Sequence, residues 1–349
     1  MEGVREVLKN TETQVAFAQG CEIDSETCEA ELLDEAVAQA ADADVIVLAL
    51  GEKSYCEKPG DIFDSMLSAG QRSLAQALAA TGKPIVLVLS EGRARVLGGI
   101  ENLADGIVMA YLPGPEGGLG IAEILFGDVN PSGRLPITYP EKSSALPIPY
   151  YHRHSEEDSY FALYPFGHGL SYSEIAYADL RLSSGSMTPA DTITVSVRVS
   201  NLSSRSAKES VLMYLSDEYR IITPEVKMLK GFTKIELAAG ESADVSFTVA
   251  AADLTFYGVD NTPQVEAGMF TVAVGGLEQR FELVVPGASA GKPLPWDKKT
   301  NRALAPSSNK LRTDEDRAGL SGETVQFLLA VSAAFVVGAF SATVVLRKN

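Results

Sequence analysis

Continuous apolar runs rich in β-branched residues recur along the first half of the chain. They cover Val45–Leu50, Ile85–Leu89 and Gly106–Leu112, and a strand-like TQVAFAQG precedes them. Runs without polar alternation are typical of parallel strands that are covered on both faces. Between them, apolar residues at helical spacing predict helices over Glu29–Ala41, Gln71–Ala80 and Ile121–Phe126. This alternation predicts an α/β sandwich over residues 1–165, in which helices flank a mostly parallel sheet.

A different pattern begins near residue 176, where apolar residues occupy every second position of short segments. These positions are Ile193, Val195, Val197 and Val199, then Val245, Phe247 and Val249, then Phe270, Val272 and Val274. Alternation with period two is expected of strands that have one face on a core. The pattern predicts an all-β sandwich of immunoglobulin or fibronectin III-like type over residues 176–285.

The carboxyl-terminal part of the chain has two further compositions. Residues 286–323 are polar and rich in Pro, Gly, Ser and charge, which predicts a disordered stalk. The run 324–346 has 23 residues without a charge, long enough to cross a bilayer as a helix. Arg347 and Lys348 follow it and predict a cytoplasmic tail over residues 347–349. We therefore expect a single-pass membrane protein whose globular part is extracellular or lumenal.

That orientation normally requires a secretory signal, and MEGVREVLKN does not contain the apolar core of one. The expectation from the sequence is that the natural amino terminus lies upstream of Met1. The net charge of −17 argues against nucleic acid as a partner, because phosphate binding needs a basic surface. The turn PGPEGG lacks the glycine spacing of a dinucleotide site, so we expect it to be a tight turn.

The cysteines and histidines do not have metal-ligand spacing, and the sequence predicts no metal and no other cofactor. Cys21 and Cys28 are close enough in sequence to form a disulfide in an oxidising compartment, and two free thiols are equally compatible with the spacing. Asn201 begins an Asn-Leu-Ser sequon and is a candidate glycosylation site.

Candidate chemistry lies in the loop after Val45–Leu50, with the sequence GEKSYCEKPGD. Loops at the carboxyl ends of parallel strands carry the active sites of α/β proteins. This loop contains Glu52 and Glu57, and the turn residues before Asp61 close it. A partly desolvated glutamate would have a raised pKa, as a general acid needs. The residues alone favour the simpler interpretation, in which both are solvated loop glutamates.

Several longer segments resemble, in order and spacing, the carboxyl-terminal two-thirds of family 3 glycoside hydrolases, the β-glucosidases and exo-β-glucanases. They are GEKSYCEKPGD, TGKPIVLVL, LPGPEGG, LFGDVNPSGRLPITYP, YPFGHGLSY and LKGFTKIELAAGES. The resemblance covers roughly residues 1–285. It implies that an α/β domain, whose first strand is missing here, is followed by a fibronectin type III-like domain. In the family a (β/α)8 barrel precedes both.

The resemblance also implies roles for individual residues. The family's acid/base glutamate corresponds to Glu57 in the pattern GE-x-x-Y-x-E-x-x-GD, while Glu52 and Asp61 are expected to order the loop. A retaining mechanism places a carboxylate nucleophile opposite this acid/base. The family's nucleophile belongs to a Ser-Asp-Trp-type motif on the barrel, and this sequence has no such motif. A β-glucoside or β-glucan would be the substrate, and a barrel would act upstream or in trans.

The sequence therefore leads to two hypotheses. The first is the carboxyl-terminal portion of a membrane-anchored retaining β-glucosidase, which supplies the acid/base but not the nucleophile. The second is a catalytically inactive, membrane-tethered carbohydrate-binding or adhesion module. Because the sugar subsite would lie mostly on the barrel, the sequence leaves glucosidase, xylosidase and glucan exohydrolase open.

Overall fold

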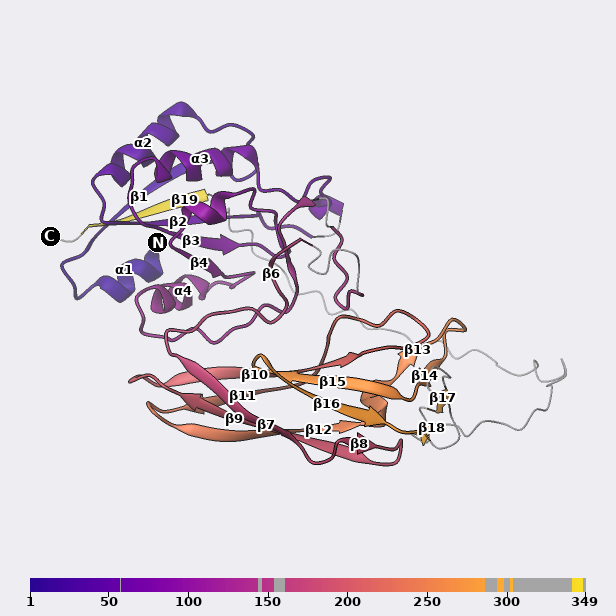
Figure 1. Ribbon diagram of the computed structural model, residues 1–349. Coiled ribbons are helices and arrows are strands. Elements are labelled where there is room, and N and C mark those ends of the chain that lie inside the picture. Colours follow the sequence, from indigo (N-terminus) through magenta and orange to yellow (C-terminus); the bar gives the residue numbers. More distant parts are fainter. Residues whose placement is uncertain are drawn as a thin grey trace, which may run out of the picture.

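The computed structural model describes residues 1–56, 58–143, 146–153, 161–285, 294–297, 302–303 and 341–347. Within them, an α/β domain precedes a β-sandwich, and the two lie side by side (Figure 1). The α/β domain contains the parallel strands β1 (Gln14–Cys21), β2 (Val45–Gly51), β3 (Ile85–Ser90) and β4 (Gly106–Met109). Its helices are α1 (Glu2–Leu8), α2 (Ala30–Ala41), α3 (Ala69–Ala79) and α4 (Gly117–Leu125).

Helices cover both faces of the sheet, with α2 and α3 on one side and α1 and α4 on the other (Figure 1). Alternate residues of the apolar runs divide between these faces. Ile46 and Leu48 pack in the same core as Leu74 of α3. Val47 belongs to the opposite core, together with Leu8 of α1. The predicted parallel sheet with helices on both faces is confirmed, while α1 was not predicted.

A fifth strand, β19 (Ser341–Arg347), lies between β1 and β2 and runs antiparallel to both (yellow in Figure 1). Val344 pairs with Phe17 of β1 and with Val47 of β2. The side chains of Val344, Val345 and Leu346 are buried. Since β1 and β2 do not pair with each other, β19 satisfies backbone groups that both strands would otherwise leave open inside the sheet.

The predicted transmembrane helix over residues 324–346 is therefore wrong for Ser341–Leu346, which form a strand. The physical reason is that a short run rich in β-branched residues suits a buried strand as well as a helix. The rest of the predicted span, residues 324–340, lies outside the described residues. Within the described ranges, no helix combines the length and apolarity that crossing a membrane requires.

The second domain is a sandwich of two sheets around one core. One sheet has the order β12 (Ser242–Ala250), β9 (Thr192–Asn201), β7 (Ile175–Leu182). The other has the order β11 (Met228–Leu237), β10 (Ala207–Asp217), β15 (Gly268–Val274), β16 (Leu277–Leu283), β8 (Ser186–Met187). Inward residues at period two, such as Val195, Val197 and Val272, fill the core between the sheets. The predicted β-sandwich is confirmed.

Short strands complete the described chain. They are β5 (Tyr139–Pro140) paired with β6 (Ala162–Tyr164), and a small sheet of β13 (Phe256–Tyr257), β14 (Pro263–Val265), β17 (Leu294–Asp297) and β18 (Arg302–Ala303). Because β17 pairs with β14, the prediction of a disordered stalk does not hold for Leu294–Asp297 and Arg302–Ala303. The remaining residues of 286–323 lie outside the described ranges.

Near the amino-terminal end of the chain, Cys21 and Cys28 form a disulfide. Of the two alternatives that the sequence left open, a disulfide or two free thiols, the structure has the disulfide.

The turn-rich segment 127–136 connects the two domains through specific contacts. Arg134 donates to Glu209 of β10 at 2.6 Å, and Tyr177 of β7 donates to the same carboxylate at 2.7 Å. Arg205 donates to the carbonyl of Gly127, and Ser210 donates to the carbonyl of Ser132. The α/β domain is thus held against β10 by a buried ion pair and backbone contacts.

Candidate active site at the strand ends

Three polar side chains follow three neighbouring parallel strands. Glu52 follows β2, Glu91 follows β3, and Tyr111 lies two residues after β4. Gly51 pairs with Ser90 in the β2–β3 register, so Glu52 and Glu91 are neighbours across the sheet. Adjacent strands are separated by about 4.8 Å, and their residues in register project to the same side. The strand ends therefore present a polar row, Glu52–Glu91–Tyr111.

The two glutamates have opposite electrostatic surroundings. Arg93 Nε and Arg95 Nη1 donate to the same oxygen of Glu52, at 2.9 and 2.7 Å. The Glu52 side chain is only 5% exposed and the Arg95 side chain 13%. Hydrogen bonds between a guanidinium group and a carboxylate are stronger than those between neutral groups. Glu52 is therefore a buried carboxylate with two positive partners.

The same two arginines hold the loop that begins at Glu52. Arg95 also donates to the carbonyls of Ser65 and Met66, which lie at the far end of this loop. Arg93 donates to the carbonyl of Gly60 at 2.6 Å, and its guanidinium lies 4.3 Å from the centre of the Tyr55 ring. The start, middle and end of segment 52–66 are therefore tied to the residues after β3.

Glu91 is fully buried and forms no ion pair within the described part of the chain, because the Arg95 guanidinium is directed to Glu52. Its Oε1 accepts from the Tyr139 hydroxyl at 2.7 Å and from the backbone N–H of Arg95 at 3.2 Å. Burial raises the pKa of Glu91 to about 7, and the neighbouring Glu52 charge adds to this, although the Tyr139 and Arg95 hydrogen bonds oppose it. Burial also raises the pKa of Tyr139 and of Tyr111.

Tyr111 shows backbone strain at the same place. Its φ of 52° lies in the left-handed region, which is unusual for a residue with a bulky side chain. Its hydroxyl is buried and, among the described residues, has no hydrogen-bond partner. The second oxygens of Glu52 and Glu91 are in the same situation. The polar row therefore retains unused hydrogen-bonding capacity at the strand ends.

The structure brings only part of the predicted site together. Glu57, the predicted acid/base, lies outside the described residues, between the described Cys56 and Lys58. Asp61 follows the short 3-10 helix Lys58–Gly60, and its backbone N–H donates to the Lys58 carbonyl at 3.0 Å. Glu52 lies at the base of the same loop. No group of three or more His, Cys, Asp or Glu residues suited to a metal ion occurs in the described part of the chain.

The glycosylation prediction at Asn201 disagrees with the structure. The side chain is 1% exposed, and its amide nitrogen donates to the carbonyls of Arg205, Leu237 and Ala238. A glycan on that nitrogen would have to replace these bonds and open the sandwich. The sequon is therefore structural here: Asn201 secures the turn after β9.

Sequence reasoning missed Glu91, Arg95 and Tyr139. The signal for Glu91 and Arg95 was available, because SEGRAR follows an apolar run just as GEK follows the first one. Applying the strand-end rule to each strand would have selected both residues. Tyr139 had no local signal, since it lies 48 residues after Glu91 in a turn-rich segment.

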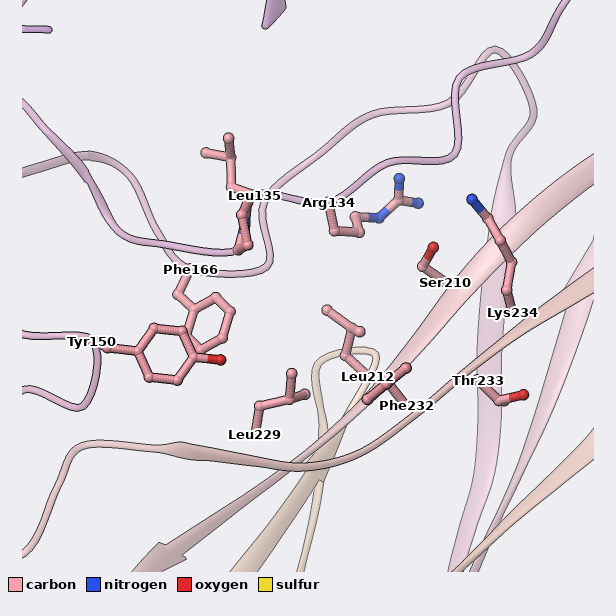
Figure 2. A pocket seen from close by; sticks show the side chains of 11 residues that line it. Arg134, Leu135, Tyr150, Phe166, Ser210, Leu212, Leu229, Phe232, Thr233 and Lys234 are labelled. Carbon is pink, nitrogen blue, oxygen red and sulfur yellow. The ribbon is translucent and has the colours of Figure 1, made fainter. Parts of the chain in front are cut away.

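A second candidate site is a pocket of about 610 Å³ between segment 134–136 and strands β10 and β11. Figure 2 shows Tyr150 and Phe166 at one end and Arg134, Ser210 and Lys234 at the other. The ring centroids of Tyr150 and Phe166 lie 5.0 Å apart. Phe232, which also lines the pocket, is 75% exposed. Aromatic faces beside hydroxyl and cationic groups could bind an amphipathic ligand.

Comparisons with known proteins agree with this two-domain arrangement. Residues 1–172 match the model of the glycosyl hydrolase family 3 C-terminal domain, and residues 209–277 match that of the fibronectin type III-like domain. The lysosomal beta glucosidase of Dictyostelium discoideum is 42% identical over 288 residues, covering 79% of this chain and 35% of that protein. The periplasmic beta-glucosidase of Salmonella typhimurium is 37% identical over 276 residues, covering 74% of this chain and 36% of that protein.

Solved structures give the same result. A β-glucosidase from Erythrobacter marinus superimposes with a TM-score of 0.72 at 34% identity, covering 81% of this chain and 43% of that one. The β-glucosidase of Listeria innocua in complex with glucose superimposes with a TM-score of 0.67 at 30% identity, covering 74% and 39%. The chain thus spans about a third of the length of the curated relatives named here.

Proposed function

Because this chain belongs to glycoside hydrolase family 3 and carries the family's C-terminal domain with a fibronectin type III-like domain, we propose that it works as part of a retaining β-glucosidase. The substrate would be a terminal, non-reducing β-D-glucosyl residue. Glu57 would be the acid/base, and the nucleophilic carboxylate would come from a barrel outside this chain. The observation that supports the proposal is the Arg93–Arg95 clamp, which ties Glu52, Gly60 and Ser65, described residues of the same segment, to the residues after β3.

The proposed mechanism has two steps. In the first, Glu57 donates its proton to the glycosidic oxygen while the nucleophile attacks the anomeric carbon, which releases the aglycone and forms a glycosyl ester. In the second, the Glu57 carboxylate takes a proton from water, and the resulting attack frees the sugar and the nucleophile. This chain supplies one of the two carboxyl groups, so on its own it is expected to hydrolyse no glucoside.

The test is to combine the chain with a family 3 barrel, for example that of the Dictyostelium relative, and to replace Glu57 with Gln. We expect kcat on a β-glucoside with a poorly acidic leaving group to fall by about 10²–10⁴-fold. A dinitrophenyl glucoside needs no proton, so its glycosylation step should be nearly unaffected, and azide should restore turnover by replacing base-assisted water.

Glu31→Gln is a matched control for this variant, because Glu31 is exposed on α2. The Glu31→Gln variant should hydrolyse both substrates at the same rates as the unaltered protein. Equal rates for Glu57→Gln and Glu31→Gln with the poor leaving group would contradict the role of Glu57. The same assay can compare glucosides with xylosides, because a beta-xylosidase of Formosa agariphila is also 34% identical to this chain.

The second candidate function is carbohydrate binding without catalysis, which the pocket between the domains favours. We expect Phe232→Ala to weaken binding of a soluble β-glucan by about tenfold, because the variant removes an exposed ring at the pocket. Tyr219→Ala is the control: Tyr219 is 74% exposed in the same domain but does not line the pocket. Affinity electrophoresis measures the binding of the glucan. If neither substitution changes it, the pocket is not the glucan-binding site.

A membrane location with the globular part outside the cytoplasm also belongs to this proposal. It is supported by the uncharged 23-residue run and the basic pair Arg347-Lys348. Strand β19 uses the last residues of that run, so one molecule can have only one of the two arrangements. Retention of the full chain in membranes washed with alkaline carbonate would support the anchor, and complete release would contradict it.

A further inference from the structure

Glu91 is a buried member of the polar row to which the proposed mechanism gives no role. Four groups with titratable or charged side chains face it from the surrounding elements: Glu52 after β2, Arg95 after β3, Tyr111 after β4 and Tyr139 in β5. The only cation among them is Arg95, and its guanidinium binds Glu52. A carboxylate at Glu91 would thus be a buried charge without a directly bound cation among the described residues, which is unfavourable.

The hydrogen bonds around Tyr139 give independent evidence for the protonation state. The Tyr139 hydroxyl has one proton but lies 2.7 Å from two acceptors, Glu91 Oε1 and the Arg95 carbonyl oxygen. A charged Glu91 would leave one of these short contacts without a proton. If Glu91 is protonated, it donates to the Tyr139 oxygen, and Tyr139 donates to the Arg95 carbonyl, so both contacts are hydrogen bonds.

This chain of bonds fixes the backbone of Arg95 on both sides. Its N–H donates to Glu91, and its carbonyl accepts from Tyr139. The Arg95 side chain in turn joins Glu52 to the carbonyls of Ser65 and Met66. The end of the loop at Ser65 and Met66 is therefore linked to the Glu91–Tyr139 pair through Arg95, while Arg93 holds Gly60.

We propose that Glu91 is a positioning residue, held as a neutral carboxylic acid, whose proton fixes Tyr139 and Arg95 and thereby the loop 52–66. The importance of this loop for catalysis rests on the proposed function; the protonation of Glu91 does not. When Glu91 loses its proton, the Glu91–Tyr139–Arg95 chain has one proton too few, and the loop is released.

The pH dependence follows from the two states of Glu91. In the released loop, Glu91 is solvated and ionises near its ordinary pKa of about 4.3. In the closed state burial raises its pKa to about 7. The stabilisation is therefore complete below about pH 4.3 and is lost as the pH rises to about 7, by up to tenfold in the opening equilibrium for each pH unit, after which it levels off.

Hydrogen exchange of the full chain tests this without any activity measurement. Corrected for intrinsic rates, the protection of amides in 52–66 should decrease between pH 5 and 7.5 in the unaltered protein and stay constant in Glu91→Gln, whose amide side chain cannot lose a proton. Tyr139→Phe removes the link to Arg95, and its loop should exchange at pH 5 as fast as the unaltered loop does at pH 7.5. The same pH dependence in the unaltered protein and in Glu91→Gln would overturn the proposal.

Glu209→Gln provides a matched control, because Glu209 is also a buried carboxyl group in contact with a tyrosine hydroxyl, but it forms an ion pair with Arg134. This variant should lower the melting temperature at every pH and leave the pH dependence of the loop unchanged. Asp217 titrates in the same range, since burial raises its pKa to about 6, so the comparison is made between variants.

The activity of the chain combined with a barrel then separates the two proposals. If Glu91 positions the acid/base loop, Glu91→Gln should move the alkaline limb of the kcat profile to higher pH while KM changes little. Loop exchange that depends on Glu91 without any glucosidase activity would support the inference and contradict the proposed function. Activity whose pH profile is unchanged in Glu91→Gln would contradict the positioning role.

Discussion

Replacement of Glu52 with Gln is expected to lower the free energy of unfolding of the α/β domain by about 3–5 kcal/mol, the usual effect of removing one partner of a buried ion pair. Glu52 is 5% exposed and accepts from Arg93 and Arg95. The variant would leave Arg95, which is 13% exposed, without a neutralising charge. Because the same arginine binds the carbonyls of Ser65 and Met66, the loss should extend to the whole loop 52–66.

Glu218→Gln is the control for this experiment. Glu218 also accepts two hydrogen bonds from one arginine, Arg280, but that arginine side chain is 67% exposed. Solvent-exposed pairs contribute about 0–1 kcal/mol, so this variant should unfold almost as the unaltered protein does. Urea unfolding followed by circular dichroism measures both. If the two variants differ by less than about 1 kcal/mol, the Arg93–Arg95 clamp does not stabilise the domain.

The sequence predicted those parts of the fold that depend on local patterns. Val45–Leu50 and Ile85–Leu89 were found as strands because parallel, doubly covered strands are apolar throughout, and the structure has them as β2 and β3. Strands of the sandwich such as β9 were found from alternation. The shorter extent of β4, Gly106–Met109, was not found, because no Gly, Pro or charged residue interrupts the sequence up to Leu112, and the left-handed backbone of Tyr111 could not be anticipated.

Contacts between residues far apart in sequence could not be predicted. The cysteine spacing left both a disulfide and two thiols open, because the choice depends on how β1 places Cys21 beside Cys28. The hydroxyl of Tyr139 reaches Glu91 because Tyr139 packs in the same core as Leu87 and Leu89 of β3, which no local pattern indicates. The strand-end rule located the loop of Glu52, but it could not show that the arginines reach Glu52 and not Glu91.

The difference between the two glutamates links stability to the proposed chemistry. Arg93 and Arg95 both donate to Glu52, whereas among the described residues no guanidinium group donates to Glu91, at the equivalent position of the next strand. A charged and a neutral carboxyl can then be neighbours without repulsion. The result is a rigid base for the loop that contains Glu57, built from residues of this chain alone.

Replacement of Val345 with Asp is expected to unfold the α/β domain while the sandwich stays folded. Val345 is fully buried in β19, between β1 and β2, and an unpaired carboxylate there would cost several kcal/mol, a large part of the roughly 5–15 kcal/mol that stabilises a domain. The helical circular dichroism signal should be lost, while the amides of β9 and β10 should keep their protection from hydrogen exchange.

Val336→Asp is the control that separates this strand from a membrane helix. Val336 belongs to the same uncharged run but lies outside the described residues. In a helix over 324–346, Val336 would lie near the bilayer centre, where an aspartate costs about 2.5–3.5 kcal/mol, and Val345 would lie near the interface, where it costs less. A strand therefore predicts that Val345→Asp is the more damaging variant, and a membrane span predicts the reverse. Greater damage from Val336→Asp, seen as loss of membrane retention with the α/β domain intact, would exclude β19 as part of the working fold.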